Sequence, residues 1–282
     1  MAIEPNITQC PIGCNSSLEA TDIVVGGMPI RKCSACGHLV GTSGEEAHAA
    51  ANLAWDTDQG TWPDARSMHR LERRRLRTIR TAAQIISRPV NTMRLLDVGC
   101  SNGALLDIAI RHGMHAEGVE PAQSAANDGL RRGFKIHVGL VEALPIPHDS
   151  FDLITNFEVI EHIRDPLPML TACHKLLRPG GVLVIGTGNV DSWTFSAIGT
   201  QWDFMHPHTG HINFYSAPSL AKLTSSNGFR VAKAWTSAVS LSNREQAHPV
   251  KYRLLKLLGQ ALEFPARLAG KGHQIELFAV KT

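Results

Sequence analysis

A glycine-containing loop follows an apolar run near the middle of the chain. The stretch Asp97-x-Gly99-x-x-x-Gly103 ends that run and precedes a helix-like segment. Glycines after a strand let the backbone approach a nucleotide closely. The spacing is not Gly-x-Gly-x-x-Gly, and no P-loop lysine is present, so a dinucleotide or a bound phosphate is disfavoured. Glu120 ends the next strand-like run, where a carboxylate can accept both hydroxyl protons of a ribose. We therefore expect a nucleoside ligand.

Four cysteines near the N-terminus have the spacing of a zinc site. A β-like segment with a turn at Gly26-Gly27 lies between the two pairs, which suggests a hairpin. Asn15 and Gly37 follow the pairs, at positions where a left-handed or tight turn would close each ligand loop. So short a segment buries little core, so a structural Zn²⁺ would stabilise its fold. The expected ligands are Cys10, Cys14, Cys33 and Cys36.

Acidic residues and a histidine follow the fourth strand-like run. In "EVIEH", Glu158, Glu161 and His162 are spaced i, i+3 and i+4, so a helix would place them on one face. Together with a histidine from elsewhere they would suit Mg²⁺ or Mn²⁺. The alternative, which we favour, is a metal-free site in which His162 is a base or an orienting group and Glu158 and Glu161 are its partners.

Residues 202–215, "WDFMHPHTGHINFY", combine aromatic side chains with three histidines. Aromatic residues can form an apolar wall for an acceptor, and an imidazole can accept a proton near neutral pH. We expect His211 to act in catalysis with His162, because it adjoins the segment that re-enters the fold. The alternative for each histidine is a solvated loop position. The expected acceptor-binding residues are Trp202, His206, His208, Phe214 and Tyr215.

Strand-like and helix-like segments alternate from residue 91 onward. This alternation predicts an α/β doubly wound sheet, with the ligand site at the carboxyl ends of the strands. We expect a helix to run from Pro166 to the stop at Pro179 and two glycines. The expected domains are a zinc ribbon at 1–44, a helical linker or lid at 45–90, and a catalytic domain at 91–282. The last contains a substrate loop at 189–218 and a helical insertion at 245–272.

Two helical segments are rich in basic residues. Residues 64–88 predict one long helix whose arginines form either a nucleic-acid arm or a solvated face; we favour the solvated face, because the net charge is only +3. Residues 249–272 predict an apolar face with basic flanks. That face could contact a membrane surface or an apolar substrate. We favour a lid or a homodimer contact.

The bulk properties of the chain indicate a globular protein. The 282 residues include 19% charged and 43% apolar residues. The first ten residues have neither the basic region nor the apolar region of a signal peptide, and the apolar runs are too short to span a bilayer. We therefore expect a cytoplasmic protein without a transmembrane segment.

Five segments together resemble the class I S-adenosylmethionine-dependent methyltransferases. They are "LLDVGCSNG", "GVEP", "VEALPIPHDSFDLITNFEVIEHI", "LLRPGGVLVIGTGN" and "HINFYSAPSLAKLTSSNGF". The resemblance implies a Rossmann-like seven-stranded sheet whose last strand is antiparallel, and S-adenosylmethionine as cofactor. It implies that Glu120 holds the ribose, that residues 140–144 flank the adenine and that Phe157 lies under the sulfonium. The implied cofactor-binding residues are Asp97, Gly99, Cys100, Ser101, Gly103, Glu120, Pro121, Glu142, Ala143, Asn156 and Phe157.

The run after the fourth strand also bears on the acceptor. It lacks the Asn/Asp-Pro-Pro-aromatic sequence typical of amino methylation of nucleobases. "EVIEH" resembles the corresponding run of ubiquinone-pathway O-methyltransferases and of small-RNA 2′-O-methyltransferases, where it is linked to a divalent metal. We therefore expect O-methylation of a small-molecule, glycan-linked or lipid-linked hydroxyl. The alternative is an RNA 2′-O-methyltransferase that holds RNA with the zinc ribbon and the arginine-rich helix.

Overall fold

The large domain is built on one mixed sheet of seven strands. The computed structural model describes residues 7–42, 61–205, 210–242 and 248–282. The strand order is β10-β11-β8-β7-β4-β5-β6, and β11 runs antiparallel to both neighbours. The expected doubly wound sheet with an antiparallel last strand is therefore confirmed. The strands are β4 (Arg94–Val98), β5 (His115–Glu120), β6 (Ile136–Val138), β7 (Phe151–Phe157), β8 (Leu177–Gly188), β10 (Phe229–Ser237) and β11 (Gln274–Lys281).

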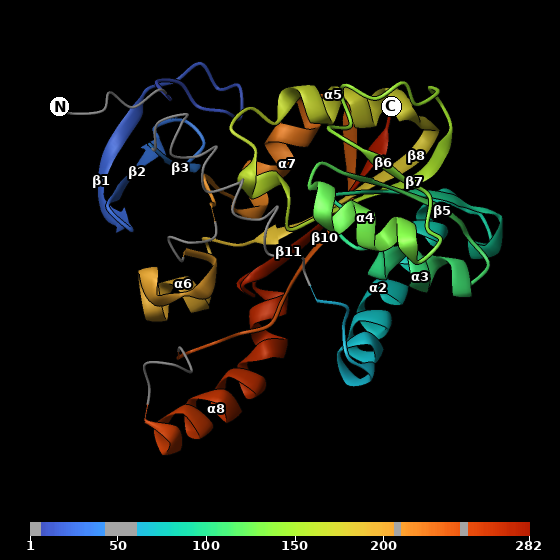
Figure 1. Cartoon of the computed structure of the whole chain (residues 1–282). Helices are drawn as coiled ribbons and strands as arrows, with labels where there is room; N and C mark the ends of the chain where they lie inside the picture. The colour runs from blue at the N-terminus through green and yellow to red at the C-terminus, as the bar shows by residue number, and fades with distance from the viewer. Residues whose placement is uncertain (1–6, 43–60, 206–209, 243–247) are drawn as a thin grey trace.

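Helices cover both faces of this sheet (Figure 1). Side chains alternate between the faces of a strand, so the neighbouring residues Leu95 and Leu96 of β4 enter different cores. Leu95 packs in the core that contains Ile79 of the helix α2, and Leu96 in the core that contains Leu170 of α5. One face carries α2 (Ala65–Ile86), α3 (Ala104–Arg111) and α4 (Gln123–Arg131), and the other carries α5 (Leu167–Leu176) and α7 (Ala217–Ser225).

The helix α2 closely matches the long helix expected at residues 64–88. Asp64 caps its start by accepting a hydrogen bond from the Ser67 N–H at 2.7 Å. Ser87 ends it in a left-handed conformation, with φ of 59°. Its buried stripe runs through Thr78, Ile79 and Ala82, which holds the helix against the sheet.

The helix α5 ends earlier than expected. It stops at Leu176 rather than at Pro179, because Leu177 already begins the long strand β8. The Leu176 carbonyl accepts a hydrogen bond from the Ser150 N–H at 2.9 Å, outside the helix. The prediction failed because Pro179 and the glycines after it were taken as the stop signal, whereas they form the irregular start of a strand.

The N-terminal cysteine segment forms a second, smaller sheet. The strands β1 (Leu18–Val25) and β2 (Met28–Cys33) form the expected hairpin, with Gly26 and Gly27 at φ of 56° and 85° in the turn. The strand β3 (Leu39–Gly41) pairs with β2. The fourth strand is β9 (Asn213–Phe214), which comes from the loop after β8 and pairs with β3. A part of the expected substrate loop therefore completes the sheet of the ribbon.

In the described part of the chain, the remaining elements are two helices and four short 3₁₀ turns. They are α6 (Trp193–Ile198), α8 (Pro249–Leu268) and the short 3₁₀ turns at Val90–Thr92, Ile160–His162, Gly199–Gln201 and Asp203–Met205. The helix α8 projects from the body of the molecule (Figure 1). Among the helices of the described residues, none is both long enough and apolar enough to cross a bilayer.

Candidate cofactor and acceptor sites

The glycine loop joins β4 to α3 at the carboxyl edge of the sheet. Gly99 and Gly103 have φ of 79° and 87°, a conformation that other residues rarely adopt. A Cβ atom on Gly99 would lie 2.2 Å from the Val159 Cγ2, so the loop after β7 packs directly on this glycine. Cys100 and Asn102 are buried, and Ser101 is half-buried with φ of 48°. The loop therefore has the tight backbone that was expected from its sequence.

Glu120 lies beside this loop, at the end of the neighbouring strand. Its carboxylate accepts hydrogen bonds from the Ser101 N–H at 2.8 Å and the Ala122 N–H at 2.9 Å, across the exposed Pro121. The side chain is 8% exposed. A carboxylate has about four acceptor positions, which is the chemistry that binding of ribose hydroxyls requires.

Asp97 is buried between the ends of two strands. The Thr155 hydroxyl donates to it at 2.6 Å. Burial raises the pKa of Asp97 to about 7, although Thr155 and the Arg75 charge oppose this shift. The loop of Gly99 and the end of β7 are thus joined through a titratable carboxyl at the centre of the site.

Arg75 of α2 reaches the same region and was missed by the sequence analysis. Its guanidinium carbon lies 3.3 Å from the centroid of the Phe157 ring. Burial lowers the pKa of Arg75 to about 10, while the charges of Glu276 and Asp97 raise it. The signal was its spacing: Arg75 precedes the buried Ile79 by four residues and so lies on the apolar stripe of the helix.

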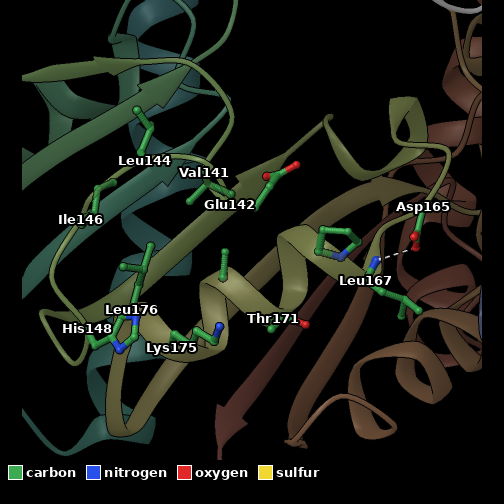
Figure 2. A pocket seen from close by; sticks show the side chains of 12 residues that line it. Val141, Glu142, Leu144, Ile146, His148, Asp165, Leu167, Thr171, Lys175 and Leu176 are labelled. Carbon is green, nitrogen blue, oxygen red and sulfur yellow. Dashed lines mark hydrogen bonds between the residues drawn. The ribbon is translucent and has the colours of Figure 1, made fainter.

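The segment expected beside the adenine lines a cavity of about 500 Å³. The cavity lies between residues 141–148 and α5, and Glu142 is part of its lining. Ala143, next in sequence, is exposed. Figure 2 shows Glu142 and Asp165 on one side of the cavity and His148 and Lys175 on the other. The cavity therefore lies between the segment assigned to the cofactor and the outer face of α5.

The "EVIEH" run is not an α-helix. Glu158 has a left-handed φ of 55°, and only one 3₁₀ turn follows it, at Ile160–His162. Asn156, at the end of β7, is fully buried, and its side-chain N–H₂ lies 3.4 Å from the Val98 carbonyl oxygen. The shared helical face expected for the acidic residues is therefore wrong, because the chain turns sharply after β7.

The structure nevertheless brings together the three residues expected in catalysis. The closest ligand atoms of Glu161, His162 and His211 all lie within 4.8 Å of one another. The rings of His162 and His211 meet edge to face, with centroids 4.5 Å apart. The His211 Nε2 lies 3.9 Å from the Glu161 Oε1. Two segments about fifty residues apart in the chain thus form one acid–imidazole cluster.

Glu161 is fully buried in this cluster. Its Oε2 accepts a hydrogen bond from the Thr187 hydroxyl at 2.9 Å, but its Oε1 accepts none from any donor in the described part of the chain. Burial and the neighbouring Glu158 carboxylate hold the pKa of Glu161 well above its usual range. A buried carboxylate beside a second acid requires a proton or a cation to balance its charge, although the Glu158 residue itself is exposed.

The protonation of His211 is fixed by its backbone contact. The His211 Nδ1 lies 2.6 Å from the Phe204 carbonyl oxygen, so this nitrogen carries the proton and Nε2 has a free lone pair. Burial lowers the pKa of His211 to about 4, so its imidazole is neutral at pH 7. A neutral imidazole can act as a base or as a metal ligand.

The aromatic residues near the cluster are tightly packed. Trp202 and Phe204 stack with ring centroids 4.9 Å apart. Phe214 and Tyr215 are fully buried against the ribbon and have no exposed surface in this structure. Acceptor binding by Trp202, Phe214 and Tyr215 stays a prediction. His206 and His208 lie outside the described residues.

The four N-terminal cysteines form a second cluster. Their sulfur atoms lie within 4.8 Å of one another, with 3.6 Å between the Cys10 and Cys36 sulfurs. Four thiolates around a zinc ion would be about 3.8 Å apart, given the usual Zn–S length. Asn15 and Gly37 have the left-handed φ values of 49° and 70° that close the two ligand loops. The residues present therefore fit a zinc ion.

The ribbon is hydrogen-bonded to the acid–imidazole cluster. His38, two residues after Cys36, has its Nε2 2.9 Å from the Asn213 Oδ1, and both side chains are fully buried. The Asn213 side chain then donates to the Ile163 carbonyl at 2.6 Å. Beside this contact, the Ile212 N–H donates to the Glu161 carbonyl at 2.9 Å. The ribbon thus supports the segments that carry Glu161 and His211.

Comparison with known proteins agrees with the fold and the cofactor region. The family described as "Methyltransferase domain" matches residues 67–234. The ubiquinone biosynthesis O-methyltransferase of Cereibacter sphaeroides is 35% identical over 124 residues, which are 40% of this chain and 49% of the relative. The protein of that name from Parvibaculum lavamentivorans is 34% identical over 125 residues. The chain spans about half the length of the curated relatives it matches.

Solved structures share the fold at low sequence identity. A SAM-dependent methyltransferase from Archaeoglobus fulgidus covers 82% of this chain and 99% of its own, with a TM-score of 0.55 and 17% identity. The geranyl diphosphate C-methyltransferase of Streptomyces coelicolor covers 77% and 81%, with a TM-score of 0.52 and 16% identity. The family match extends over more than half of the chain, from α2 into β10. The chain therefore belongs to the methyltransferase domain family, and its large domain has the fold of the S-adenosylmethionine-dependent enzymes.

Proposed function

We propose that this protein is an S-adenosylmethionine-dependent O-methyltransferase whose acceptor is a hydroxyl of a small, glycan-linked or lipid-linked molecule. Family membership supports the methyl transfer, and the relatives named for O-methylation support the acceptor atom. The RNA alternative depended on the zinc ribbon and on the arginine-rich helix. Arg75 and Arg77 of that helix lie instead on Phe157 and Trp235, so they bind the domain itself.

The cofactor would lie at the carboxyl edge of β4, β5 and β7. Glu120 would accept the ribose hydroxyls, and the backbone at Gly99 and Gly103 would approach the methionine part. Arg75, one helix away, would attract the cofactor carboxylate, because no other part of S-adenosylmethionine is anionic. The sulfonium supplies an activated methyl group, so the chain mainly binds, orients and desolvates the reactants.

The acceptor would lie at the acid–imidazole cluster. The observation that carries this proposal is the meeting of Glu161, His162 and His211 within 4.8 Å, with a buried carboxylate oxygen that lacks a donor in the described residues. Two imidazoles with a carboxylate suit Mn²⁺ better than Mg²⁺, which prefers oxygen ligands, and Glu158 lies beside the set. Such a cation would supply Lewis acidity that favours loss of the acceptor hydroxyl proton.

The residues of the chain have defined tasks in this proposal. The Phe204 carbonyl fixes the tautomer of His211, so that its Nε2 lone pair faces Glu161. Thr187 holds the second oxygen of Glu161. In the metal-free alternative, the same Nε2 accepts the hydroxyl proton directly. The four thiolates of the ribbon would hold a structural Zn²⁺, since a closed sphere of four ligands leaves no position for a substrate.

The test is Mn²⁺ binding followed by electron paramagnetic resonance, on protein whose zinc content is known. We expect Glu161→Gln and His211→Ala each to weaken Mn²⁺ binding by about tenfold or more. The matched control is Glu120→Gln, which should weaken S-adenosylmethionine binding and leave Mn²⁺ binding unchanged. Methyl transfer to a panel of alcohol and amine acceptors should yield methyl ethers. No Mn²⁺ binding would refute the cation site, and N-methylated products alone would refute the hydroxyl acceptor.

A further inference from the structure

The helix α8 presents an apolar face to the outside of the molecule. Its inner side is narrow: Gly259 and Ala266 are its buried residues, and a Cβ on Gly259 would lie 2.6 Å from the Val239 carbonyl oxygen. The outer side carries six large apolar side chains. Their exposures are 60% for Val250, 63% for Leu254, 63% for Leu257, 49% for Leu258, 70% for Phe264 and 74% for Leu268.

These side chains form one stripe. At 3.6 residues per turn they fall within an arc of about 120°, on the side of the helix opposite Gly259 and Ala266. Exposed apolar residues are ordinary when they are scattered, but a continuous stripe along a helix that projects from the body indicates a surface for another partner (Figure 1).

The charges on α8 indicate which partner. Four basic side chains and one acidic side chain lie on this helix, all of them exposed. Arg253, Lys256 and Arg267 follow one border of the stripe, and Lys251 follows the other. An apolar stripe between basic borders matches the boundary of an anionic bilayer, where acyl chains lie just beneath negative headgroups.

A second copy of the chain fits these charges less well. In a two-fold dimer each copy would contribute the same surface, so the basic borders of the two α8 helices would lie close together. Glu263 is the single acidic residue that each helix would supply. A helix that crosses the bilayer is also a poor fit, because α8, although 20 residues long, is not apolar enough for a span.

The far end of α8 is held firmly to the domain. The Asn189 side chain donates to the carbonyls of Gly270 and Gly272 at 3.2 and 2.8 Å, and Lys271 pairs with Asp191 at 2.6 Å. The helix therefore has a fixed orientation, and its stripe can meet a flat surface without rearrangement.

We propose that α8 docks this protein on an anionic membrane surface, with the stripe 250–268 among the headgroups and the basic borders on the lipid phosphates. This interaction does not depend on the methyl acceptor. The interaction is peripheral: it combines burial of apolar side chains with attraction to negative lipid, so it weakens when either contribution is removed.

The experiment is co-sedimentation of the full chain with vesicles of phosphatidylcholine, with or without about 30 mol% phosphatidylglycerol. We expect binding to the anionic vesicles and a decrease with salt. Removing three basic side chains from the borders of the stripe (Lys251→Gln, Arg253→Gln, Lys256→Gln) should weaken binding about fivefold per charge. The matched control removes three exposed charges from α2: Arg66→Gln, Arg70→Gln and Arg73→Gln.

The apolar contribution is tested by Leu254→Gln combined with Leu257→Gln, which should weaken binding about tenfold or more at unchanged net charge. Its control is Ile110→Gln with Leu130→Gln, two exposed apolar residues of α3 and α4. Equal loss in the control pairs would overturn the proposal. Absence of vesicle binding would also overturn the proposal. This outcome includes the case in which the wild type is a dimer that the Leu254→Gln/Leu257→Gln variant converts to a monomer. S-adenosylmethionine affinity, unchanged in all variants, shows that the domain is folded.

Discussion

The N-terminal ribbon and the helix α8 are both additions to the methyltransferase sheet, but their apolar surfaces face opposite ways. In the ribbon, Ile30 and Val40 are fully buried, and so is Phe214 of the strand that completes its sheet. On α8, Phe264 and Leu268 are 70% and 74% exposed. The apolar side chains of the ribbon pack against other parts of this chain, whereas the stripe of α8 has no such partner among the described residues.

The difference extends to hydrogen bonds. The ribbon is joined to the acceptor region through backbone pairing of β3 with β9 and through the buried contact of His38 with Asn213. The body of α8 faces the domain with the buried Gly259 and Ala266 and with half-buried apolar side chains such as Leu255 and Leu262. Changes in the ribbon should therefore alter the rate of methyl transfer, and changes on the outer face of α8 should not.

The largest expected effect is loss of the metal from the ribbon. Cys33→Ser removes one of four thiolates, and so small a sheet has little core to replace the metal. We expect about one zinc ion per chain in the wild type, none in the variant, and a fall in the rate of methyl transfer of about 10²-fold or more, because His211 and Glu161 lose their support. Elemental analysis and a methyl-transfer assay measure the two quantities.

The control for this variant is Ser34→Ala, next to the cluster but outside it. S-adenosylmethionine affinity, measured by calorimetry, should stay within a few-fold in Cys33→Ser, since Glu120 and the glycine loop lie on the large sheet. A zinc-free variant that keeps full activity would show that the ribbon does not support the acceptor site.

A smaller effect is expected from loss of the side-chain contact between His38 of the ribbon and Asn213 of the acceptor region. Asn213→Ala removes the partner of His38 and the donor to the Ile163 carbonyl, and it leaves buried groups unpaired. Each unpaired group lowers the free energy of unfolding by about 1–3 kcal/mol. Because Glu161 and His211 would also lose their alignment, we expect kcat to fall about 10- to 100-fold. Mn²⁺ affinity should fall in parallel, while KM for S-adenosylmethionine stays nearly constant.

The matched control is Asn227→Ala, which also removes an asparagine-to-carbonyl bond, 2.7 Å long, to Leu223 at the end of α7. It should lower stability without changing Mn²⁺ affinity. If both variants lose activity and metal binding equally, the effect of Asn213 is general destabilisation and the proposed support is wrong.

The same contrast explains what the sequence could predict. The glycine loop, Glu120 and the cysteine pairs are local patterns, in which spacing alone determines the backbone geometry. Pairing of β3 with β9 joins residues about 170 positions apart, and two-residue strands have no periodicity to detect. His211 was identified by its neighbours in sequence, but its contact with Glu161 is tertiary. Arg75 lies in a run of arginines and was not singled out, although its position on the buried stripe distinguishes it from the exposed arginines around it.

The smallest expected effect concerns the stability of α8. An exposed apolar side chain that touches little in the folded state gains little from folding, so Leu254→Gln with Leu257→Gln should change the free energy of unfolding by less than about 0.5 kcal/mol per site. The contrasting variant is Ile30→Ala in the ribbon, where a fully buried side chain is lost and about 2–5 kcal/mol is expected for the part that unfolds with it. Urea unfolding without vesicles measures both. A large loss in the α8 pair would mean that its stripe is covered in solution, by another copy or by the domain itself, and that the two additions are alike after all.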